Sequence, residues 1–284
     1  MIYSYTNSDQ EGTIRLIKGE SQLSRNYYKQ QVGDTFHSIA WNIGKSQKIL
    51  IDEIEYQFES NSILPLTLNQ SFSFELPENI VLWQFNREFY CIANHDKEVG
   101  CVGFIFFGPS PTMFIELDTT DREKMSRILD QFEEEFVSDE DIKGEMLRIL
   151  LVRLIIKITR IAKKQYVDLD QYEDGKFDLV RQYNLLVEIH FRVEHQVNFY
   201  AKQLHKSPKT ISNYFSILSK KTPLQIIHDR IITEAKRLFY YTNKSVKEIA
   251  SELGFDEVSH FSTFFKKVTF QSPTQLKNAL KKQD

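Results

Sequence analysis

Two short segments of this 284-residue chain, 207–218 and 256–268, place polar side chains beside an apolar stripe at helical spacing. In the first segment the outward positions are Lys209, Thr210, Ser212 and Asn213. An asparagine amide can make paired hydrogen bonds to adenine, a lysine can reach the acceptors of guanine, and a threonine can touch the methyl group of thymine. The first segment therefore carries chemistry suited to reading base edges.

The second segment is less basic. Its outward positions are Asp256, Glu257, Ser259, His260, Ser262 and Thr263. Asp256 and Glu257 would repel phosphates unless they cap a helix or accept a hydrogen bond from cytosine. We therefore expect the first segment to make more of the direct base contacts, and the opposite assignment is the alternative.

Lysines flank both segments and can neutralise phosphates. They are Lys206, Lys220, Lys221, Lys244, Lys266 and Lys267. Such contacts supply affinity and salt dependence but no discrimination between sequences. We assign these lysines, apart from Lys244, to the same contact surface, together with Ser207 at the start of the first segment. The alternative for each lysine is a solvated surface charge.

Metal and catalytic chemistry has little support. The first 180 residues contain two histidines, His37 and His95, and neither lies in an HxH arrangement with a downstream acid. The sequence also lacks GxSxG, HExxH and phosphate-loop motifs. We therefore predict no metal site, no cofactor and no catalytic residue.

A small-molecule pocket has a weaker basis in the first half of the chain. His37, Trp41, Trp83 and Phe85 stand at alternating positions of two strand-like runs and could line such a pocket. Alternating aromatic residues in a strand more often form core, so both interpretations stay open, and no ligand follows from these residues.

The two polar segments belong to an internal repeat. Residues 200–226 resemble residues 249–276: Ala201 and Leu204 recur 49 positions later, and Phe215, Pro223 and Gln225 recur 50 positions later. The second copy therefore has one extra residue in its turn.

Each copy has the mechanics of a helix-turn-helix. A small residue, Ala201 or Ala250, permits a close helix crossing. The turn then needs a positive φ, which Gly254 adopts without steric cost and which His205 must adopt in the first copy. We expect the second helices to begin after Ser207 and after Asp256. Their inner faces are Ile211, Tyr214, Phe215 and Leu218 in one copy, and Val258, Phe261, Phe264, Phe265 and Val268 in the other. A long amphipathic helix over 223–242 would join the copies.

The sequences SVKEIASELGF and SHFSTFFKK, followed by Ser272-Pro273, make residues 181–280 resemble the DNA-binding domain of the AraC/XylS family of bacterial transcription regulators. The resemblance implies double-stranded DNA as partner, RNA polymerase as a further candidate partner, and control by a small-molecule effector or by dimerisation. The preceding half resembles, by its layout, the cupin-like sensor barrel and helical dimerisation segment that many members carry.

The sequence departs from this family pattern at several positions. His205 replaces a usual glycine, and Lys220 and Phe270 stand where each copy usually has a glycine before Ser/Thr-Pro. Asn213 and Thr263 occupy positions that are often arginine. These changes bear on base preference more than on fold.

Residues 35–118 read as short strands separated by Gly, Pro, Asn and Asp, which is typical of a small barrel or sandwich. The runs are 36–44, 47–58, 63–68, 71–76, 80–92 and 99–108. Residues 1–34 give no clear pattern.

Two helices should follow. The first, 119–136, opens with a Thr or Asp cap and carries Met125, Ile128, Leu129, Phe132 and Phe136 on one face. The second, about 139–164, has a wide apolar stripe. We favour a helix pair that meets its copy in a homodimer through 119–165, because the stripe is wider than one small barrel face would cover. A helix buried against the barrel is the alternative.

The charge balance changes along the chain. Residues 181–284 contain 17 Lys and Arg against 9 Asp and Glu, a net charge of +8, whereas residues 1–180 contain 19 against 30, a net charge of −11. This asymmetry favours an acidic unit joined to one that meets polyanions. The predicted α+β organisation is a cupin-like sensor barrel (1–118), a helical dimerisation segment (119–165), a linker (166–176) and an all-α DNA-binding domain with two helix-turn-helix units (177–284).

Two cysteines, Cys91 and Cys101, favour reduced thiols over a disulfide framework. No apolar run is long enough to cross a membrane and no export signal is apparent, so we expect a cytoplasmic protein.

The leading hypothesis for the function is a DNA-binding transcription regulator, and the alternative is a cupin-type small-molecule binding protein or metalloenzyme with a helical interaction domain. The operator, the effector and the choice between activator and repressor stay open.

Overall fold

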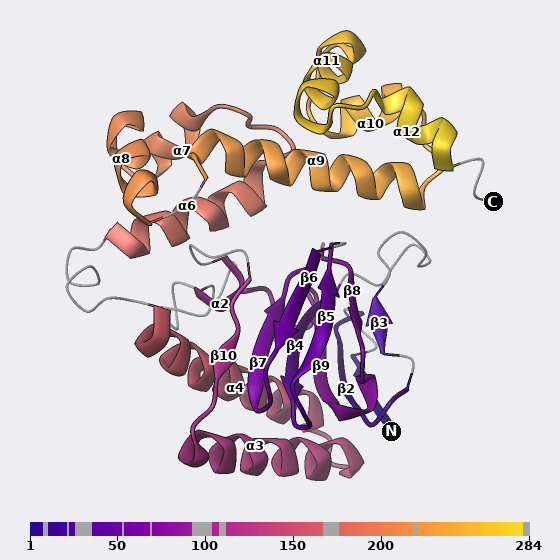
Figure 1. Cartoon of the computed structure of the whole chain (residues 1–284), viewed down its shortest axis with the longest axis vertical. Coiled ribbons are helices and arrows are strands. Elements are labelled where there is room, and N and C mark those ends of the chain that lie inside the picture. Colours follow the sequence, from indigo (N-terminus) through magenta and orange to yellow (C-terminus); the bar gives the residue numbers. More distant parts are fainter. Residues whose placement is uncertain are drawn as a thin grey trace. The chain divides into compact units, whose positions relative to one another are not determined.

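The computed structural model describes residues 1–7, 11–21, 23–25, 36–52, 54–68, 70–92, 104–107, 112–166, 176–218 and 221–280 (Figure 1). These residues form two compact units. Unit 1 contains the described residues up to Tyr166, and unit 2 contains those from Lys176 onward. Residues 167–175 of the predicted linker lie outside the described residues.

The larger sheet of unit 1 is antiparallel and has the strand order β1-β2-β9-β4-β7-β10. Its strands are β1 (Ile2–Thr6), β2 (Thr13–Lys18), β4 (Phe36–Asn42), β7 (Ser62–Leu66), β9 (Ile80–Asn86) and β10 (Ile115–Glu116). β4 and β9 lie at its centre and are buried over nearly their whole length. This explains why both read as runs of β-branched and aromatic residues.

A smaller antiparallel sheet packs against the first and has the order β3-β8-β5-β6. Its strands are β3 (Ser24–Arg25), β5 (Gln47–Ile51), β6 (Ile54–Phe58) and β8 (Phe72–Phe74), and a short 3-10 turn, η1 (Pro77–Asn79), precedes β9. One core cluster joins the two sheets, with Ala40 and Leu82 from the larger sheet and Ile49, Phe58 and Phe74 from the smaller one. The α+β prediction of a β-sheet unit followed by a helical unit is confirmed.

The strand predictions need two corrections. Residues 104–107, predicted as strand, form a helical turn, α2 (Phe104–Phe107), whose Phe104, Ile105 and Phe106 are buried. Packing against neighbouring elements overrides the strand propensity of these residues. The N-terminal region, which gave no clear pattern, supplies β1, β2 and β3. The remainder of the run 99–108 lies outside the described residues.

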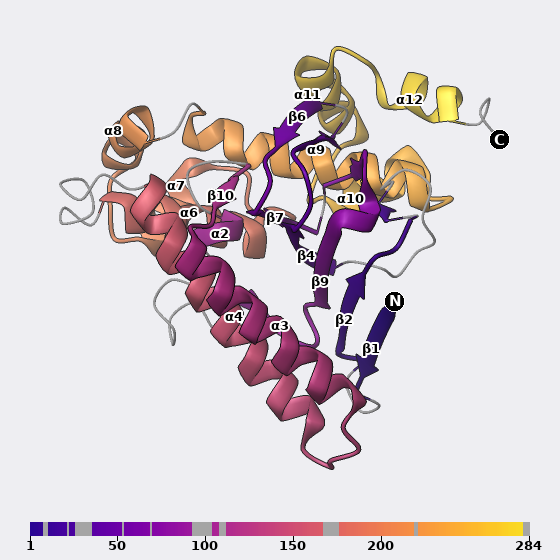
Figure 2. The ribbon, with the colours of Figure 1, turned by 60° about the horizontal axis from the view of Figure 1, so that its bottom comes forward.

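Two helices of unit 1 form an antiparallel pair beside the larger sheet, α3 (Thr119–Val137) and α4 (Lys143–Tyr166) (Figure 2). Asp118 caps α3 by accepting a hydrogen bond from the backbone N–H of Asp121 at 2.7 Å. All five residues of the predicted apolar face of α3 are buried. α4 begins at Lys143, four residues later than predicted, because 139–142 form the turn between the helices.

The wide stripe of α4 is buried within the chain. Leu147, Leu151, Leu154 and Ile158 are fully inaccessible, whereas Met146 is exposed. The width of the stripe, which favoured the dimer at the level of sequence, is therefore explained by packing inside unit 1, as the alternative held. Any interface must use the other side of the helix pair.

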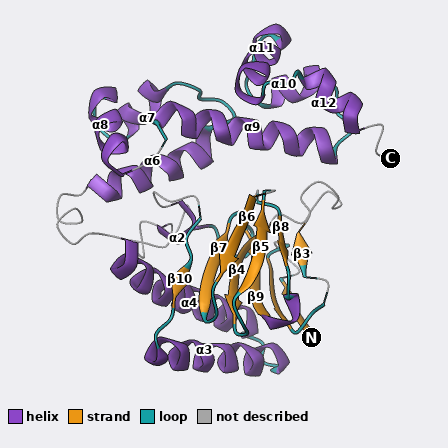
Figure 3. Ribbon diagram, in the orientation of Figure 1, coloured by secondary structure: helices purple, strands orange, loops and turns teal. Residues whose placement is uncertain are grey.

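Unit 2 contains only helices in its described part (Figure 3). They are α6 (Lys176–His190), α7 (Val197–Gln203), α8 (Pro208–Leu218), α9 (Pro223–Tyr241), α10 (Val246–Glu252), α11 (Val258–Thr269) and α12 (Pro273–Leu280). Capping boxes start α9 at Thr222 and α10 at Ser245. A single core cluster runs through the unit and includes the inner faces of both α8 and α11.

Candidate nucleic-acid interface

The two repeat copies fold as helix-turn-helix units, α7–α8 and α10–α11. The turns have positive φ at the two predicted positions, 53° at His205 and 75° at Gly254. The histidine thus adopts a conformation that costs a residue with a Cβ about 1–2 kcal/mol. The prediction that both copies need this backbone conformation is confirmed.

The hydrogen bonds of the two turns match. The N–H of Lys206 donates to the carbonyl of Ala201 at 2.9 Å, and the N–H of Phe255 donates to that of Ala250 at 2.9 Å. Both bonds close the same six-residue C-terminal motif, which satisfies carbonyls that the end of the first helix leaves free. Both alanines are fully buried at the helix crossing.

The starts of the second helices differ. The Ser207 hydroxyl accepts from the backbone N–H of Thr210 at 3.1 Å and therefore caps α8, as predicted. In the second unit the cap position is Glu257, whose side chain makes no cap hydrogen bond, and α11 begins at Val258. The predicted start after Asp256 is therefore one residue early, because Asp256 still belongs to the turn.

Most predicted contact residues of the first unit are exposed. Lys206, Ser207, Lys209, Ser212, Asn213 and Lys221 are exposed, and Thr210 is half-buried. The hydroxyl of Thr210 also lies 2.8 Å from that of Ser207, so its oxygen is engaged at the cap. Lys220 lies outside the described residues. The opposite side of α8 buries Ile211 and Phe215, so one face is left for a ligand.

The second unit presents a similar face. Its exposed members are Asp256, Glu257, Ser259, His260, Thr263, Lys266 and Lys267, and Ser262 is half-buried. Phe261 and Phe265 lie buried on the other side of α11. Each recognition helix therefore has a polar face that the rest of unit 2 leaves uncovered.

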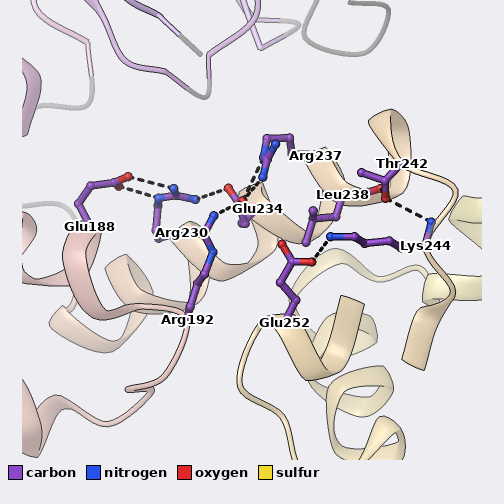
Figure 4. A network of polar contacts seen from close by, with 9 residues as sticks. All are labelled: Glu188, Arg192, Arg230, Glu234, Arg237, Leu238, Thr242, Lys244 and Glu252. Atoms are coloured by element: carbon purple, nitrogen blue, oxygen red, sulfur yellow. Dashed lines mark hydrogen bonds and ion pairs between the residues drawn. The ribbon is translucent and has the colours of Figure 1, made fainter. Parts of the chain in front are cut away.

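A buried ion network holds α6 and α9 together (Figure 4). Glu234 of α9 is 1% exposed, and it accepts hydrogen bonds from Arg192 at 2.7 Å, from Arg230 at 3.1 Å and from Arg237. Arg230 also donates to both carboxylate oxygens of Glu188 on α6, from Nε at 2.6 Å and from Nη2 at 3.0 Å. Sequence patterns do not predict this network, because alternating charges on an amphipathic helix are typical of a solvated face.

The network sets the ionisation of its members. Burial raises the pKa of Glu234, but the charges of Arg230, Arg237 and Arg192 outweigh it and hold the pKa at about 2. Burial lowers the pKa of Arg230, but Glu188 and Glu234 more than compensate and raise it. Both groups are therefore charged throughout the physiological range.

The segment between α6 and α7 touches both helix-turn-helix units. The Tyr200 hydroxyl of α7 donates to the Glu194 carbonyl at 2.6 Å. The His195 ring lies 4.7 Å from that of Phe255, just after the second turn. Burial lowers the pKa of His195, although the carbonyls of Leu253 and Phe191 oppose this shift. The segment 191–196 therefore connects the first unit, the second unit and, through Arg192, the helix between them.

The solvent side of the α3–α4 pair in unit 1 carries a groove of about 410 Å³. Its apolar lining includes Ile128, Ile149, Val152 and Ile156. Its charged lining is entirely basic and consists of Lys124, Arg127, Arg153, Lys157 and Arg160. Ile149 is 60% exposed, so this face holds apolar surface that unit 1 does not cover.

The four residues predicted for a ligand pocket lie on one face of the larger sheet. The register pairs His37 with Phe85 and places Trp41 and Trp83 on the same side. This side faces the helices, not the smaller sheet: the His37 ring lies 4.8 Å from Phe106, and the Trp83 ring lies 6.0 Å from Phe132 of α3. The indole N–H groups of Trp41 and Trp83 are buried and have no hydrogen-bond partner in the described part of the chain.

Cys91 forms no disulfide with any described residue, and Cys101 lies outside the described residues. No cluster of three or more potential metal ligands occurs among the described residues. Within the same ranges, every helix is too short or too polar to cross a bilayer.

Comparison with known proteins concerns mainly unit 2. Residues 200–279 match the family model described as a helix-turn-helix domain. The Uncharacterized HTH-type transcriptional regulator YobQ of Bacillus subtilis (strain 168) is 32% identical over 76 residues. That alignment covers 27% of this chain and 32% of YobQ, so the chain matches about a third of the length of this relative.

Solved structures that match the chain include ToxT from Vibrio cholerae O395, with a TM-score of 0.42 and 17% identity over 98% of this chain and 96% of that one. The C-terminal domain of the two-component response regulator yesN from Fusobacterium nucleatum has a TM-score of 0.32 and 23% identity. That match covers 34% of this chain and 93% of the yesN chain.

Proposed function

We propose that this chain, whose residues 200–279 match the family model of a helix-turn-helix domain, is a sequence-specific DNA-binding transcription regulator of the AraC type. The observation that carries the proposal is the pair of recognition helices, α8 and α11, each with one buried apolar face and one exposed polar face in a single compact unit. Two such helices suit successive major grooves of one duplex, about 34 Å apart.

The contact residues divide by chemistry. Asn213 is proposed to read adenine, and Lys209 is proposed to read guanine, because both project from the exposed face of α8. Lys206, Lys221, Lys266 and the other exposed lysines are proposed to neutralise phosphates. The net charge of +8 over residues 181–284 supports binding to a polyanion.

A gel-shift assay against the DNA upstream of the protein's own gene tests this proposal, and genomic footprinting of the tagged protein would then identify the operators. We expect retarded complexes that weaken steeply between about 50 and 200 mM salt. Binding that is equally strong to every duplex would contradict sequence-specific recognition. No complex with any promoter fragment at low salt would contradict DNA binding altogether.

We also propose that unit 1 controls unit 2, through a homodimer or an effector. For the dimer, the support is the groove on the α3–α4 pair, whose ends differ in charge. One end carries the basic groove residues, and the other carries Asp130, Glu134, Asp139, Glu140, Asp141 and Glu145. A two-fold axis at the middle of the pair would bring the basic end of one copy onto the acidic end of the next.

For an effector, the support is the pair of buried indole N–H groups of Trp41 and Trp83 beside His37. A buried donor without a partner is costly, and an acceptor on a small molecule would satisfy it. Binding of RNA polymerase belongs to the same proposal and would follow once the chain occupies a promoter.

A further inference from the structure

A groove of about 560 Å³ lies between the first turns of α9 and the outer side of α11. His260, Thr263 and Lys267 of its lining belong to the predicted contact surface. Gln225, His228 and Asp229 of α9 line the other wall, and none of them is among the predicted contact residues. The groove therefore joins known candidates for DNA contact to residues of the connecting helix.

The polar groups of the groove suit an anion. Lys267 supplies an ammonium group, and His228 supplies an imidazole. Gln225 accepts the backbone N–H of Thr222 through Oε1 at 2.7 Å, so its Nε2 is the atom that can donate to a ligand. Asp229 is the one acid among the described lining residues, and it pairs with Lys221 at 2.7 Å. This pairing offsets part of its negative charge.

The position of the groove points to the source of that anion. The groove is lined by the first turns of α9 and by α11. α8 ends just before α9 begins, and both α8 and α11 pack against α9, so we infer that the groove lies between the two recognition helices. If α8 and α11 enter successive major grooves, the sugar-phosphate backbone that separates them must cross this surface. Resting on the proposed function, we propose that a phosphate of the DNA backbone is bound in this groove by Gln225, His228 and Lys267.

The protonation state of His228 should make DNA binding at this site depend on pH, which can be measured. Burial lowers the pKa of His228, the charges of Lys267 and His195 lower it further, and Asp229 opposes them. The His228 ring packs edge-on against Phe264 at 5.0 Å, and the other titratable residues that line the groove are Asp229, His260 and Lys267. His228 is therefore mostly neutral in the free protein at neutral pH. A phosphate beside it would favour the imidazolium form, so binding takes up a proton and affinity falls as the pH rises.

The first experiment compares the affinity of the full chain for a labelled upstream duplex between about pH 6 and 8 at constant ionic strength. We expect the wild type to bind several-fold more tightly at the lower pH, and His228→Gln to lose most of that gain while it binds nearly as well as wild type at the higher pH. His190→Gln is the control, because this histidine lies on α6 against Phe199 and does not line the groove. It should keep the wild-type pH dependence.

The second experiment measures salt dependence and does not rely on a histidine variant. Lys267→Gln should reduce the slope of log affinity against log salt by about 1, whereas Lys247→Gln, at an exposed position of α10, should leave it unchanged. Calorimetry of the wild type in two buffers with different ionisation enthalpies should show net proton uptake on binding even if His228→Gln fails to fold.

The outcomes separate the two proposals. If the wild type binds DNA without proton uptake, or if His228→Gln folds and keeps the full pH dependence, the phosphate site is wrong and the proposed function stands. An unchanged salt slope in Lys267→Gln would also contradict the site. If the wild type binds no duplex, the proposed function fails and the site fails with it.

Discussion

The carbonyl oxygen of Arg192 packs closely against the α-carbon of Gly254, because a Cβ placed at Gly254 would lie only 2.1 Å from that oxygen. The glycine of the second turn therefore has two roles, a positive φ of 75° and a close approach of the segment between α6 and α7. Only the first role is visible in the sequence. Through this contact the second helix-turn-helix unit packs against the same segment that binds the first.

Gly254→Ala should destabilise unit 2 strongly. Alanine must adopt positive φ, at a cost of about 1–2 kcal/mol, and its methyl group must displace the backbone of Arg192, which adds about 1–3 kcal/mol. Denaturant unfolding measures the loss. Gly19→Ala is the matched control, because Gly19 has a φ of 64° with nothing within 4 Å of its Cβ position, and it should lose only the first contribution. Equal losses in both variants would contradict the packing role.

Glu234→Gln should lower the free energy of unfolding by about 3–5 kcal/mol, because it removes a buried counter-charge from the partly buried Arg230 and Arg237, although Arg230 keeps Glu188 as a partner. Glu257→Gln, at an exposed position without a cap hydrogen bond, should change it by less than about 0.5 kcal/mol. Chemical unfolding at neutral pH measures both. A loss below about 1 kcal/mol for Glu234→Gln would show that solvent or rearrangement compensates the arginines.

The Glu234 carboxylate should also make the free energy of unfolding depend on pH in the acidic range. Its folded pKa is about 2, below the ordinary value of 4.5, so its contribution is complete above about pH 4.5 and is lost as the pH falls toward 2. The shift corresponds to roughly 3 kcal/mol. The stability difference between wild type and Glu234→Gln should therefore shrink across this window when unfolding is measured at successive pH values. A difference independent of pH would contradict the assignment.

Phe270→Gly should stabilise unit 2, an unusual result for removal of an aromatic side chain. Phe270 ends α11 with a φ of 60° and is 92% exposed, so its ring gains little from burial while its backbone is strained. Glycine relieves about 1 kcal/mol of that strain. Phe270→Ala keeps the strain and should give no gain. Thermal unfolding distinguishes the two, and a gain for both variants would mean that the ring, not the backbone, is unfavourable.

The buried and exposed faces of a helix can be predicted from the sequence where its apolar residues follow a single helical period. The apolar residues of α8 and α11 recur at helical spacing, so their buried and exposed faces followed directly, and the repeat identified His205 as the partner of Gly254. Prediction from the sequence failed where tertiary contacts decide. Alternation puts His37, Trp83 and Phe85 on one face of a sheet, but it does not say that helices cover that face.

The same limit explains the remaining errors and omissions. The apolar stripe of α4 has the same sequence pattern whether it packs against its own chain or against a second chain, so the pattern does not distinguish the two. Phe104–Phe107 has strand-like composition, yet it packs as a helical turn. Glu234 looks like any charge on an amphipathic helix, because Arg230 and Arg237 lie one helical turn away from it, as ion pairs on a solvated face do. Glu188 and Arg192, which complete the network, come from outside α9, and the periodicity of α9 does not connect them with Glu234.

Asn213→Ala should remove discrimination at one base position and cost about 1–3 kcal/mol of affinity for the preferred site. Asn213 is exposed on α8, where its amide is proposed to pair with adenine. Binding-site selection with the variant should return a consensus relaxed at that position alone. Asn198→Ala, at an exposed position on α7, is the control and should return the wild-type consensus. An unchanged consensus for Asn213→Ala would rule out the assignment.

Ile149→Asp should weaken the proposed homodimer by at least about tenfold without unfolding unit 1. Ile149 is 60% exposed in the groove of the α3–α4 pair, so a carboxylate there is tolerated by the isolated chain but must be desolvated in an interface. Ile54→Asp is the control, because Ile54 is 57% exposed on β6 of the smaller sheet. Sedimentation equilibrium measures both. Because the ends of the helix pair differ in charge, the wild-type dimer should also weaken as salt rises. A wild-type chain that is monomeric at all concentrations, or a dimer equally sensitive to both substitutions, would remove this face from consideration.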